Sequence, residues 1–310
     1  MKLPIRENGL SGTAWVGPMS DDEYHADPCR VPSLSASMAK VLDAKSPAHA
    51  FLLHPRLGGE RSKPTAAMER GTVMHAGLLG TGNDHRMVIP EGVENYKTKV
   101  AQEMRDAIRT AGKIPVLFTD EQDNDATVRA LKRRMGYKGV HFSDGKAEQV
   151  IIWEEVAGSG RKVQCRAKVD YVQGHVITDL KSCVSAAPEE ISTAMARYRY
   201  PVQAAAYTSG LSAVFPELAG TVEFRWVFFE SAPPFAVSRV RPSEQDMDIA
   251  RAQWQRAIDV WDACMHAGAW PDYDSAATAD PMIIETPYWY SRAQSYRFGF
   301  DDLSEIGLTI

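Results

Sequence analysis

One stretch of the chain, residues 161–182, constrains the fold more than any other. Apolar and polar residues alternate along residues 161–172, which is the pattern of a β-strand with one buried face. Gly174 and His175 then predict a tight turn. A further strand is expected over residues 176–182. We therefore expect the two strands to pair across this turn.

Three charged residues gather on this pair of strands. Asp170 is close to the end of the first strand, and Asp179 and Lys181 lie on the second. Side chains two positions apart on a strand point to the same side, so Asp179 and Lys181 project together while Leu180 points into the opposite layer. If the strands pair, Asp170 approaches Asp179. Two carboxylates and an ammonium then meet at one site.

This grouping suits the hydrolysis of a phosphodiester. Two carboxylates can hold a hard, oxygen-preferring cation such as Mg²⁺, and that cation polarises the phosphate and lowers the pKa of a bound water. Lys181 would orient or deprotonate the water, or neutralise charge in the transition state. From spacing alone, the same residues also fit a hairpin with a surface ion pair, which contributes little to stability.

The rest of the chain predicts one α/β domain with a helical N-terminal portion. Ser35 and Ser46 are placed to begin two short helices. Further helices are expected over residues 66–79, 97–111, 120–135, 187–197, 201–213 and 243–267. Further strands are expected over residues 148–156, 221–230 and 235–241. We divide the chain into an irregular N-terminal arm (1–33), the main domain (34–268) and an irregular aromatic tail (269–310) that packs on the domain.

Composition limits the classes of protein that fit. The 310 residues are enough for a sizeable core, and no apolar run approaches the ~20 residues that span a bilayer. The N-terminus shows no signal-peptide pattern, so we expect a cytoplasmic protein without a membrane partner. The four cysteines form no CxxC pair, so we expect no structural zinc and no iron–sulfur cluster.

The net charge of −5 argues weakly against nucleic-acid binding, but it does not report local patches. Basic residues cluster in two segments, residues 129–138 and 197–199. The candidate DNA contacts in these segments are Arg133, Arg134, Lys138, Arg197 and Arg199. A solvated helix face would explain each cluster equally well.

Four stretches, in this order along the chain, resemble one known family. They are residues 34–55 (LSASMAKVLDAKSPAHAFLLHP), 69–80 (ERGTVMHAGLLG), 147–182 (with AEQVIIWEE, CRAKVDYV and VITDLKS) and 198–211 (YRYPVQAAAYTSGL). The third is similar to the core of the PD-(D/E)xK nuclease superfamily in its D…DxK variant. The whole set is similar to the RecE-type exonucleases of phages and prophages (exodeoxyribonuclease VIII-like), which are related to RecB-like and lambda-type exonucleases.

The resemblance implies a restriction-endonuclease-like core, which is a central mixed β-sheet flanked by helices. It implies that Asp170 and Asp179 bind the metal and that Lys181 is catalytic. It also implies that the backbone carbonyl of Leu180 joins the metal shell. His75, in its Gly-Thr-x-x-His context, is implied at the same metal site.

Three more residues take their predicted functions from the resemblance. Glu148 is implied near the metal as a catalytic residue, although Glu154 and Glu155 lie close enough to compete for this assignment. Gln203 and Tyr207 are neighbours on one helix face. Gln203 is a catalytic candidate that could hold a phosphate oxygen. Tyr207 is either a DNA contact or a buried structural residue.

The activity implied is the Mg²⁺-dependent digestion of linear double-stranded DNA from its 5′ ends, which leaves 3′ single strands for a single-strand annealing protein. Mn²⁺ is expected to substitute for Mg²⁺. Relatives assemble as rings that enclose DNA, so a homo-oligomeric ring is expected. The alternatives are a structure-specific or restriction-like DNA endonuclease with the same chemistry, and a catalytically silent DNA-binding module.

Changing either carboxylate, as Asp170→Ala or Asp179→Ala, is expected to abolish DNA cleavage. Each change removes a charged ligand from a cation that the chemistry requires. The measurement is the release of acid-soluble nucleotide from duplex DNA in Mg²⁺. Near-native activity of either variant would show that the site is assigned to the wrong residues.

Overall fold

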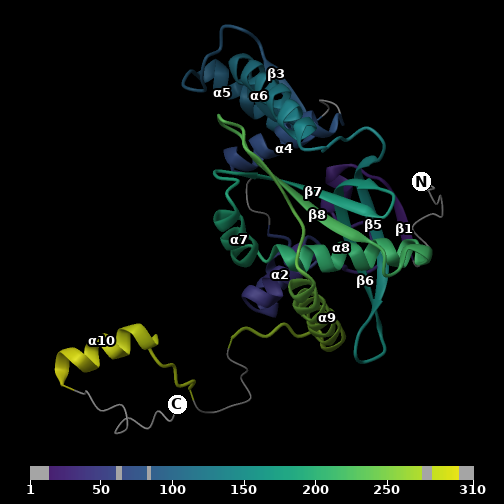
Figure 1. Cartoon of the computed structure of the whole chain (residues 1–310), viewed down its shortest axis with the longest axis vertical. Coiled ribbons are helices and arrows are strands. Elements are labelled where there is room, and N and C mark those ends of the chain that lie inside the picture. The colour runs from purple at the N-terminus through teal and green to yellow at the C-terminus, as the bar shows by residue number, and fades with distance from the viewer. Residues whose placement is uncertain (1–13, 61–64, 82–84, 274–280, 300–310) are drawn as a thin grey trace. The chain divides into compact units, whose positions relative to one another are not determined.

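The computed structural model describes residues 14–60, 65–81, 85–273 and 281–299. The chain divides into two compact units, residues 1–270 and 271–310. The second unit contains the helix α10 (Tyr288–Phe298), and the first holds the sheets and the other helices (Figure 1). Among the described residues, no helix is long and apolar enough to cross a membrane.

A mixed β-sheet runs through the first unit (Figure 1). Its strands follow the order β1 (Ala14–Pro18), β5 (Lys146–Val156), β6 (Lys162–Gln173), β7 (Val176–Cys183), β8 (Glu223–Glu230) and β9 (Val237–Val240), and β2 (Leu34–Ser35) pairs with β6. The pairs β7–β8 and β2–β6 are parallel, and the other pairs are antiparallel. The predicted fold class, a central mixed sheet flanked by helices, is confirmed.

The hairpin of β6 and β7 forms where the alternation of residues predicts it. Gly174 closes the turn with φ 61°, a left-handed backbone that glycine adopts without a steric cost. The register pairs Gln173 with Val176, Val172 with Ile177 and Tyr171 with Thr178. From β7, the chain passes through α7 (Pro188–Arg197) and α8 (Tyr200–Val214) to reach the parallel strand β8.

Helices cover both faces of this sheet. On one face, α8, α9 (Glu244–Ala267) and α2 (Ala36–Ala44) contribute to an apolar cluster that includes Ala39, Val202, Leu211 and Trp254. On the other face, α4 (Ala66–Leu79) and α6 (Phe118–Tyr137) contribute to a second cluster that includes Met74, Leu131, Leu180 and Val227. Leu180 enters this second layer, as the spacing predicts, so the side chains on either side of it point toward α8.

Shorter elements complete the first unit. They are α1 (Asp21–His25), α3 (Pro47–Leu53), β3 (Arg86–Ile89), α5 (Lys99–Thr110), β4 (Ile114–Leu117) and the 3-10 helix η1 (Pro216–Leu218). β3 and β4 form a separate parallel sheet. These two strands are not predicted from the sequence, because four residues are too few to establish an alternating pattern.

The structure differs from two predictions of irregular segments. In the described part of residues 1–33, β1 pairs with the edge of β5, and Ser20 and Glu23 form a capping box that begins α1. In the described part of residues 269–310, α10 forms one regular helix. The elements in these segments are short, so the periodicity of their residues is weak. The capping box of α1 is nevertheless readable from the sequence. The packing of the tail on the domain stays a prediction.

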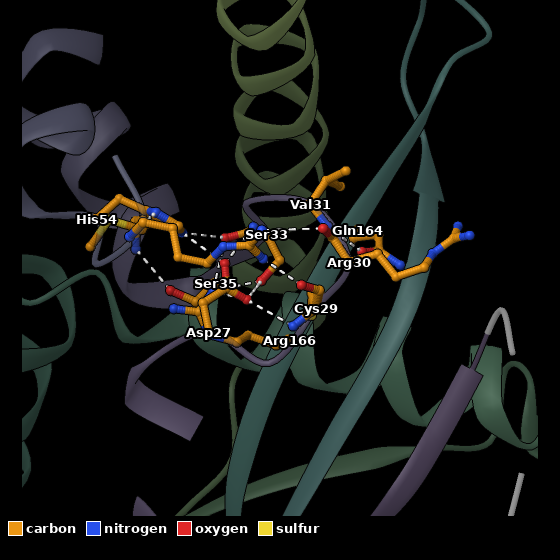
Figure 2. Close-up of polar contacts among 11 residues, drawn as sticks. Asp27, Cys29, Arg30, Val31, Ser33, Ser35, His54, Gln164 and Arg166 are labelled. Atoms are coloured by element: carbon orange, nitrogen blue, oxygen red, sulfur yellow. Dashed lines mark hydrogen bonds and ion pairs between the residues drawn. The ribbon is translucent and has the colours of Figure 1, made fainter. Parts of the chain in front are cut away.

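A buried polar cluster fixes the segment between α1 and α2 (Figure 2). The Asp27 carboxylate accepts a hydrogen bond from Ser33 Oγ at 2.8 Å and lies 3.2 Å from both His54 Nε2 and Arg166 Nη1. Asp27, Ser33 and His54 are the residue types of a hydrolase triad. However, the serine hydroxyl donates to the aspartate rather than to the histidine, and all three side chains are buried. The cluster is therefore structural, and it ties this segment to β6 and to the end of α3.

Asp27→Ala is expected to lower the free energy of unfolding by roughly 3–5 kcal/mol, since it leaves the buried Arg166 guanidinium without its carboxylate. Burial raises the pKa of Asp27, but the hydrogen bond from His54, the charge of Arg166 and the hydrogen bonds from Ser33 together hold this pKa below its usual range. The pKa is thus lower in the folded state than in the unfolded state. The stabilisation is therefore complete above the unfolded pKa of about 4 and is lost as the pH falls through the folded value.

Urea unfolding at pH 7 and near pH 3 measures both effects. The matched control is Asp248→Ala, because Asp248 is exposed and pairs only with its helix neighbour Arg251 among the described residues. We expect this control to change the free energy of unfolding by less than about 0.5 kcal/mol. Equal losses for the two variants at pH 7 would contradict the importance of the Asp27 cluster.

Candidate active site

The strands β6 and β7 stop pairing one residue before the two aspartates would meet. Their register ends at Tyr171 and Thr178, and Asp170 and Asp179 are next in line. At this point the Leu180 N–H donates a hydrogen bond of 2.7 Å to Asp170 Oδ2. A side-chain carboxylate therefore bridges the opening between the strands. The expectation that Asp170 approaches Asp179 is met by this arrangement.

Asp179 is held by two partners. Its side chain is 3% exposed, Gln203 Nε2 of α8 donates to its Oδ1 at 2.8 Å, and Lys181 Nζ lies 2.5 Å from its Oδ2. Asp179 and Lys181 thus project together, as their spacing predicts. Gln203 contacts the carboxylate in place of the phosphate oxygen that the sequence analysis gives it. Through this hydrogen bond, Gln203 orients the Asp179 carboxylate.

The site brings two carboxyl groups together with one lysine. Burial, followed by the negative charge of Asp179, raises the pKa of Asp170 well above its usual range. Burial alone would lower the pKa of Lys181, but the charges of Asp179 and Asp170 outweigh burial and raise that pKa. Lys181 is therefore an ammonium in this environment. A further positive charge would stabilise the two carboxylates in their ionised form.

His75 reaches the same place from α4. Its Nδ1 lies 3.7 Å from Asp170 Oδ2, and its ring lies against Phe229 with centroids 6.0 Å apart. Burial lowers the pKa of His75 to about 4. The imidazole is therefore neutral at physiological pH, which is the form that can bind a metal.

Glu148 lies on β5 where the strand geometry is irregular. It has φ 52°, and the register of β5 and β6 passes from Ala147↔Tyr171 to Gln149↔Val169, so that Glu148 and Asp170 form no pair in it. The alternation of buried faces shifts at the same point, because Val169 belongs to one apolar cluster and Tyr171 to the other. The Glu148 carboxylate lies 2.7 Å from Lys168 Nζ. At Glu148 and Asp170, the side chains of β5 and β6 therefore depart from the regular alternation between the two faces of the sheet.

The two competing glutamates are engaged elsewhere. Glu154 lies 2.8 Å from Lys162 Nζ. Glu155 accepts hydrogen bonds from Trp153 and Trp254. Of the three glutamates, Glu148 is therefore the one that lies at the candidate site.

The site opens into a cleft of about 1170 Å³. Its lining includes residues of α1, α4, β5, β6 and α8, among them His75, Glu148, Lys168, Asp170 and Tyr207. Tyr207 is 8% exposed and packs edge-on against Phe224 at 6.0 Å. The buried structural reading of Tyr207 fits this environment, and a contact between its ring and DNA stays a prediction.

The residues at the opening of the strands suit a hard divalent cation. Within the described ranges, no group of three or more His, Cys, Asp or Glu is arranged to hold a metal ion. However, Mg²⁺ needs only one or two protein carboxylates, because it keeps waters and accepts phosphate oxygens. The 3.7 Å between His75 and Asp170 is too long for a hydrogen bond but less than twice a metal–ligand distance of about 2.1 Å. Asp170, Asp179 and His75 would hold the cation, and the participation of the Leu180 carbonyl stays a prediction.

The predicted DNA contacts lie in different environments. Arg133, Arg134, Lys138 and Arg197 are exposed. Arg199 instead forms an ion pair with Asp43 of α2. Its guanidinium therefore has a partner within the protein, and a DNA contact from Arg199 would have to compete with that ion pair.

Lys40 and Tyr200, which are not predicted as site residues, also lie beside Lys181. Lys40 of α2 and Lys181 both approach the ring of Tyr200, with their Nζ atoms 5.3 and 5.1 Å from its centroid. Lys40 lies in the stretch 34–55 that resembles the family, but a single lysine on a short helix gives no sequence signal of its own. Only the packing of α2 against α8 brings it to the site.

The fold and the site define a domain of the PD-(D/E)xK nuclease type. Residues 35–280 match the family described as "PDDEXK-like domain of unknown function". The chain belongs to this family. The superfamily predicted from the four stretches is therefore confirmed, and the RecE-type branch stays a prediction.

Two solved structures are similar to this chain. A "putative exonuclease" from Eubacterium rectale aligns with a TM-score of 0.57 and 11% identity, over 89% of this chain and 98% of that chain. The structure of SSO0001 aligns with a TM-score of 0.27 and 11% identity, over 69% of this chain and 99% of that chain. No curated protein matches the chain. At this identity, the first structure supports the shared fold.

Gln203→Leu is expected to lower DNA cleavage by roughly 10- to 100-fold, because residues that orient a metal ligand typically contribute this much to activity or metal affinity. Leucine fills a similar volume but cannot donate the hydrogen bond to Asp179. The loss should be largest at low Mg²⁺ concentration. The matched control is Thr208→Ala on the same helix, whose hydroxyl donates only to carbonyls of α8. Equal activities of the two variants would contradict this function of Gln203.

Proposed function

We propose that this protein is a metal-dependent exodeoxyribonuclease that degrades linear double-stranded DNA. The observation that carries the proposal is the convergence of Asp170 and Asp179, with Lys181, where β6 and β7 separate. A buried and a partly buried carboxylate suit a divalent cation, and the neighbouring cleft gives a substrate access to Asp170. Membership of the PDDEXK-like family supports phosphodiester hydrolysis as the reaction.

Each side chain has a distinct task in this proposal. A cation held by Asp170 and Asp179 would polarise the scissile phosphate and lower the pKa of the attacking water. Lys181 donates hydrogen bonds to a phosphate oxygen or to the water and stabilises the charge that develops in the transition state. Gln203 fixes the rotamer of Asp179. His75, which is neutral, can donate a ring-nitrogen lone pair to the cation without adding charge.

The dependence on DNA ends rests on the resemblance to RecE-type exonucleases. The similar structure from Eubacterium rectale carries the name of an exonuclease, which favours the same activity here. The resemblance further suggests 5′-to-3′ digestion, a homo-oligomeric ring around the DNA, and transfer of the remaining 3′ strand to a single-strand annealing protein. Mg²⁺ is the proposed ion and Mn²⁺ the proposed substitute. The exposed residues Arg133, Arg134 and Lys138 of the α6 segment are candidates for the wall of a DNA channel.

Linear duplex DNA is expected to be degraded to mononucleotides and a residual single strand, while covalently closed circular duplex stays intact. The chemistry attacks a phosphodiester at any position, so the restriction to ends must come from a channel that admits only an end. Gel electrophoresis and nucleotide release from both substrates measure the difference. EDTA should stop the reaction, and excess Mg²⁺ or Mn²⁺ should restore it.

A matched control is the same plasmid after a single restriction cut, so that sequence and length do not change. Nicking or linearisation of the closed circle by the pure protein would contradict the exonuclease and favour the endonuclease. Tight DNA binding in Mg²⁺ without any cleavage would favour the silent binding module. The rate on linear duplex should fall as salt rises, because phosphate contacts release counterions.

A further inference from the structure

Two stacked tyrosines lead from the surface to Lys181. The rings of Tyr198 and Tyr200 are 5.6 Å apart at an angle of 28°. Tyr200 is half-buried against β8, with its ring 6.5 Å from Trp226 and 6.0 Å from Phe228. Tyr198 is the outer member and is 51% exposed. An aromatic face therefore reaches solvent next to the lysine of the candidate active site.

The turn that carries the tyrosines has an uncommon backbone conformation. Arg199, between them, has φ 51° and ψ 44°, in the left-handed region that residues with a Cβ rarely occupy. Its guanidinium pairs with Asp43, and this contact fastens the turn to α2, the helix that carries Lys40. Such strain persists only where surrounding contacts maintain it, and it clusters at functional sites.

Two lysine side chains approach the Tyr200 ring, and within the described residues only Lys181 has a carboxylate partner. Lys181 Nζ lies 2.5 Å from Asp179. Lys40 forms no ion pair with any carboxylate of the described residues, and its Nζ lies 5.3 Å from the ring centroid. Burial and then the positive charge of Lys181 lower the pKa of Lys40 to about 8. An anion beside Lys40 would offset both the burial of its ammonium and the repulsion from Lys181.

A nucleotide carries both an anion that can pair with Lys40 and a flat ring that can stack on Tyr198. The anion is its phosphate, and the flat ring is its base. Arg197 lies over the Tyr198 ring at 5.7 Å and adds a second positive charge. Lys40 and Tyr198 both neighbour the Tyr200 ring.

We propose that Tyr198 and Lys40 hold one nucleotide of a single DNA strand beside Lys181, with the base stacked on Tyr198 and the phosphate at Lys40. In duplex DNA, neighbouring base pairs cover both faces of each base, so only an unpaired or terminal base can stack on this ring. Stacking of this kind is independent of sequence. We call Tyr198 and Lys40 together the nucleotide seat. The inference rests on the proposed exonuclease function and deepens it, because this seat would select the separated strand at a DNA end.

Binding of a fluorescent single-stranded oligonucleotide in EDTA tests the seat without any cleavage. Tyr198→Ala should weaken binding by roughly 5- to 150-fold, since stacking on one aromatic ring contributes about 1–3 kcal/mol per base. Tyr198→Phe keeps the ring and should bind within about twofold of the wild type. Binding of a closed circular duplex should be the same for all three proteins, since it offers no free base.

The phosphate contact is tested by the salt dependence of the same binding at pH 7. Lys40→Met should reduce the slope of log K against log salt by about 0.7, which is the contribution of one phosphate contact on a single strand. The control is Lys162→Met, because Lys162 lies near the opposite end of β6 from Asp170 and is 62% exposed. We expect the control to leave the slope unchanged.

The outcomes separate this inference from the proposed function. Loss of binding in Tyr198→Ala and Lys40→Met, with recovery in Tyr198→Phe, supports the seat even if the wild-type protein cleaves no DNA. Wild-type binding by both loss variants would overturn the seat even if the protein degrades linear duplex. Equal weakening by Tyr198→Ala and Tyr198→Phe would also overturn it, because the ring would then not be the binding group. If Lys40→Met does not fold, the comparison of Tyr198→Ala with Tyr198→Phe decides the question, because Tyr198 is half-exposed.

Discussion

The Leu180 amide donates a hydrogen bond to the Asp170 carboxylate at the point where β6 and β7 stop pairing. This contact lets two neighbouring strands separate without leaving a buried backbone donor unsatisfied, a loss that would otherwise cost free energy. The opening leaves the partly buried Asp170 close to the buried Asp179. Burial and mutual repulsion raise the pKa of Asp170, so the arrangement is stable in its ionised form only with added positive charge.

Other parts of the fold hold the groups around this opening. Gln203 of α8 and Lys181 of β7 engage Asp179, while α4 brings the neutral His75 to Asp170. The Asp27 cluster fixes the segment that leads into α2, where the Ser35 side chain accepts the first capping hydrogen bond. The ion pair between Arg199 and Asp43 fastens the turn that carries the two tyrosines to the same helix. Because α2 carries Lys40, the Asp27 cluster and this turn both determine which groups surround Lys181.

Local patterns predict much of this site, and long-range contacts account for what they miss. Asp179 and Lys181 are two residues apart on one strand, so strand geometry alone places them together, and the turn at Gly174 brings Asp170 near. No local pattern predicts the φ of 52° at Glu148 or the shift of faces at Asp170, since both depend on how β5, β6 and β7 pack. Lys40 and Tyr200 meet across 160 residues, and β1 is too short to show its period.

We propose that Asp170 and Asp179 share one divalent cation. Crystals of the protein soaked in Mn²⁺ test it directly, because Mn²⁺ accepts oxygen ligands like Mg²⁺ and is visible by anomalous scattering. We expect an anomalous peak in contact with one oxygen of each carboxylate, and Lys181 displaced from its 2.5 Å contact with Asp179 or sharing it. A peak bound elsewhere, or no peak while Asp179 keeps only its Gln203 and Lys181 partners, would contradict the claim.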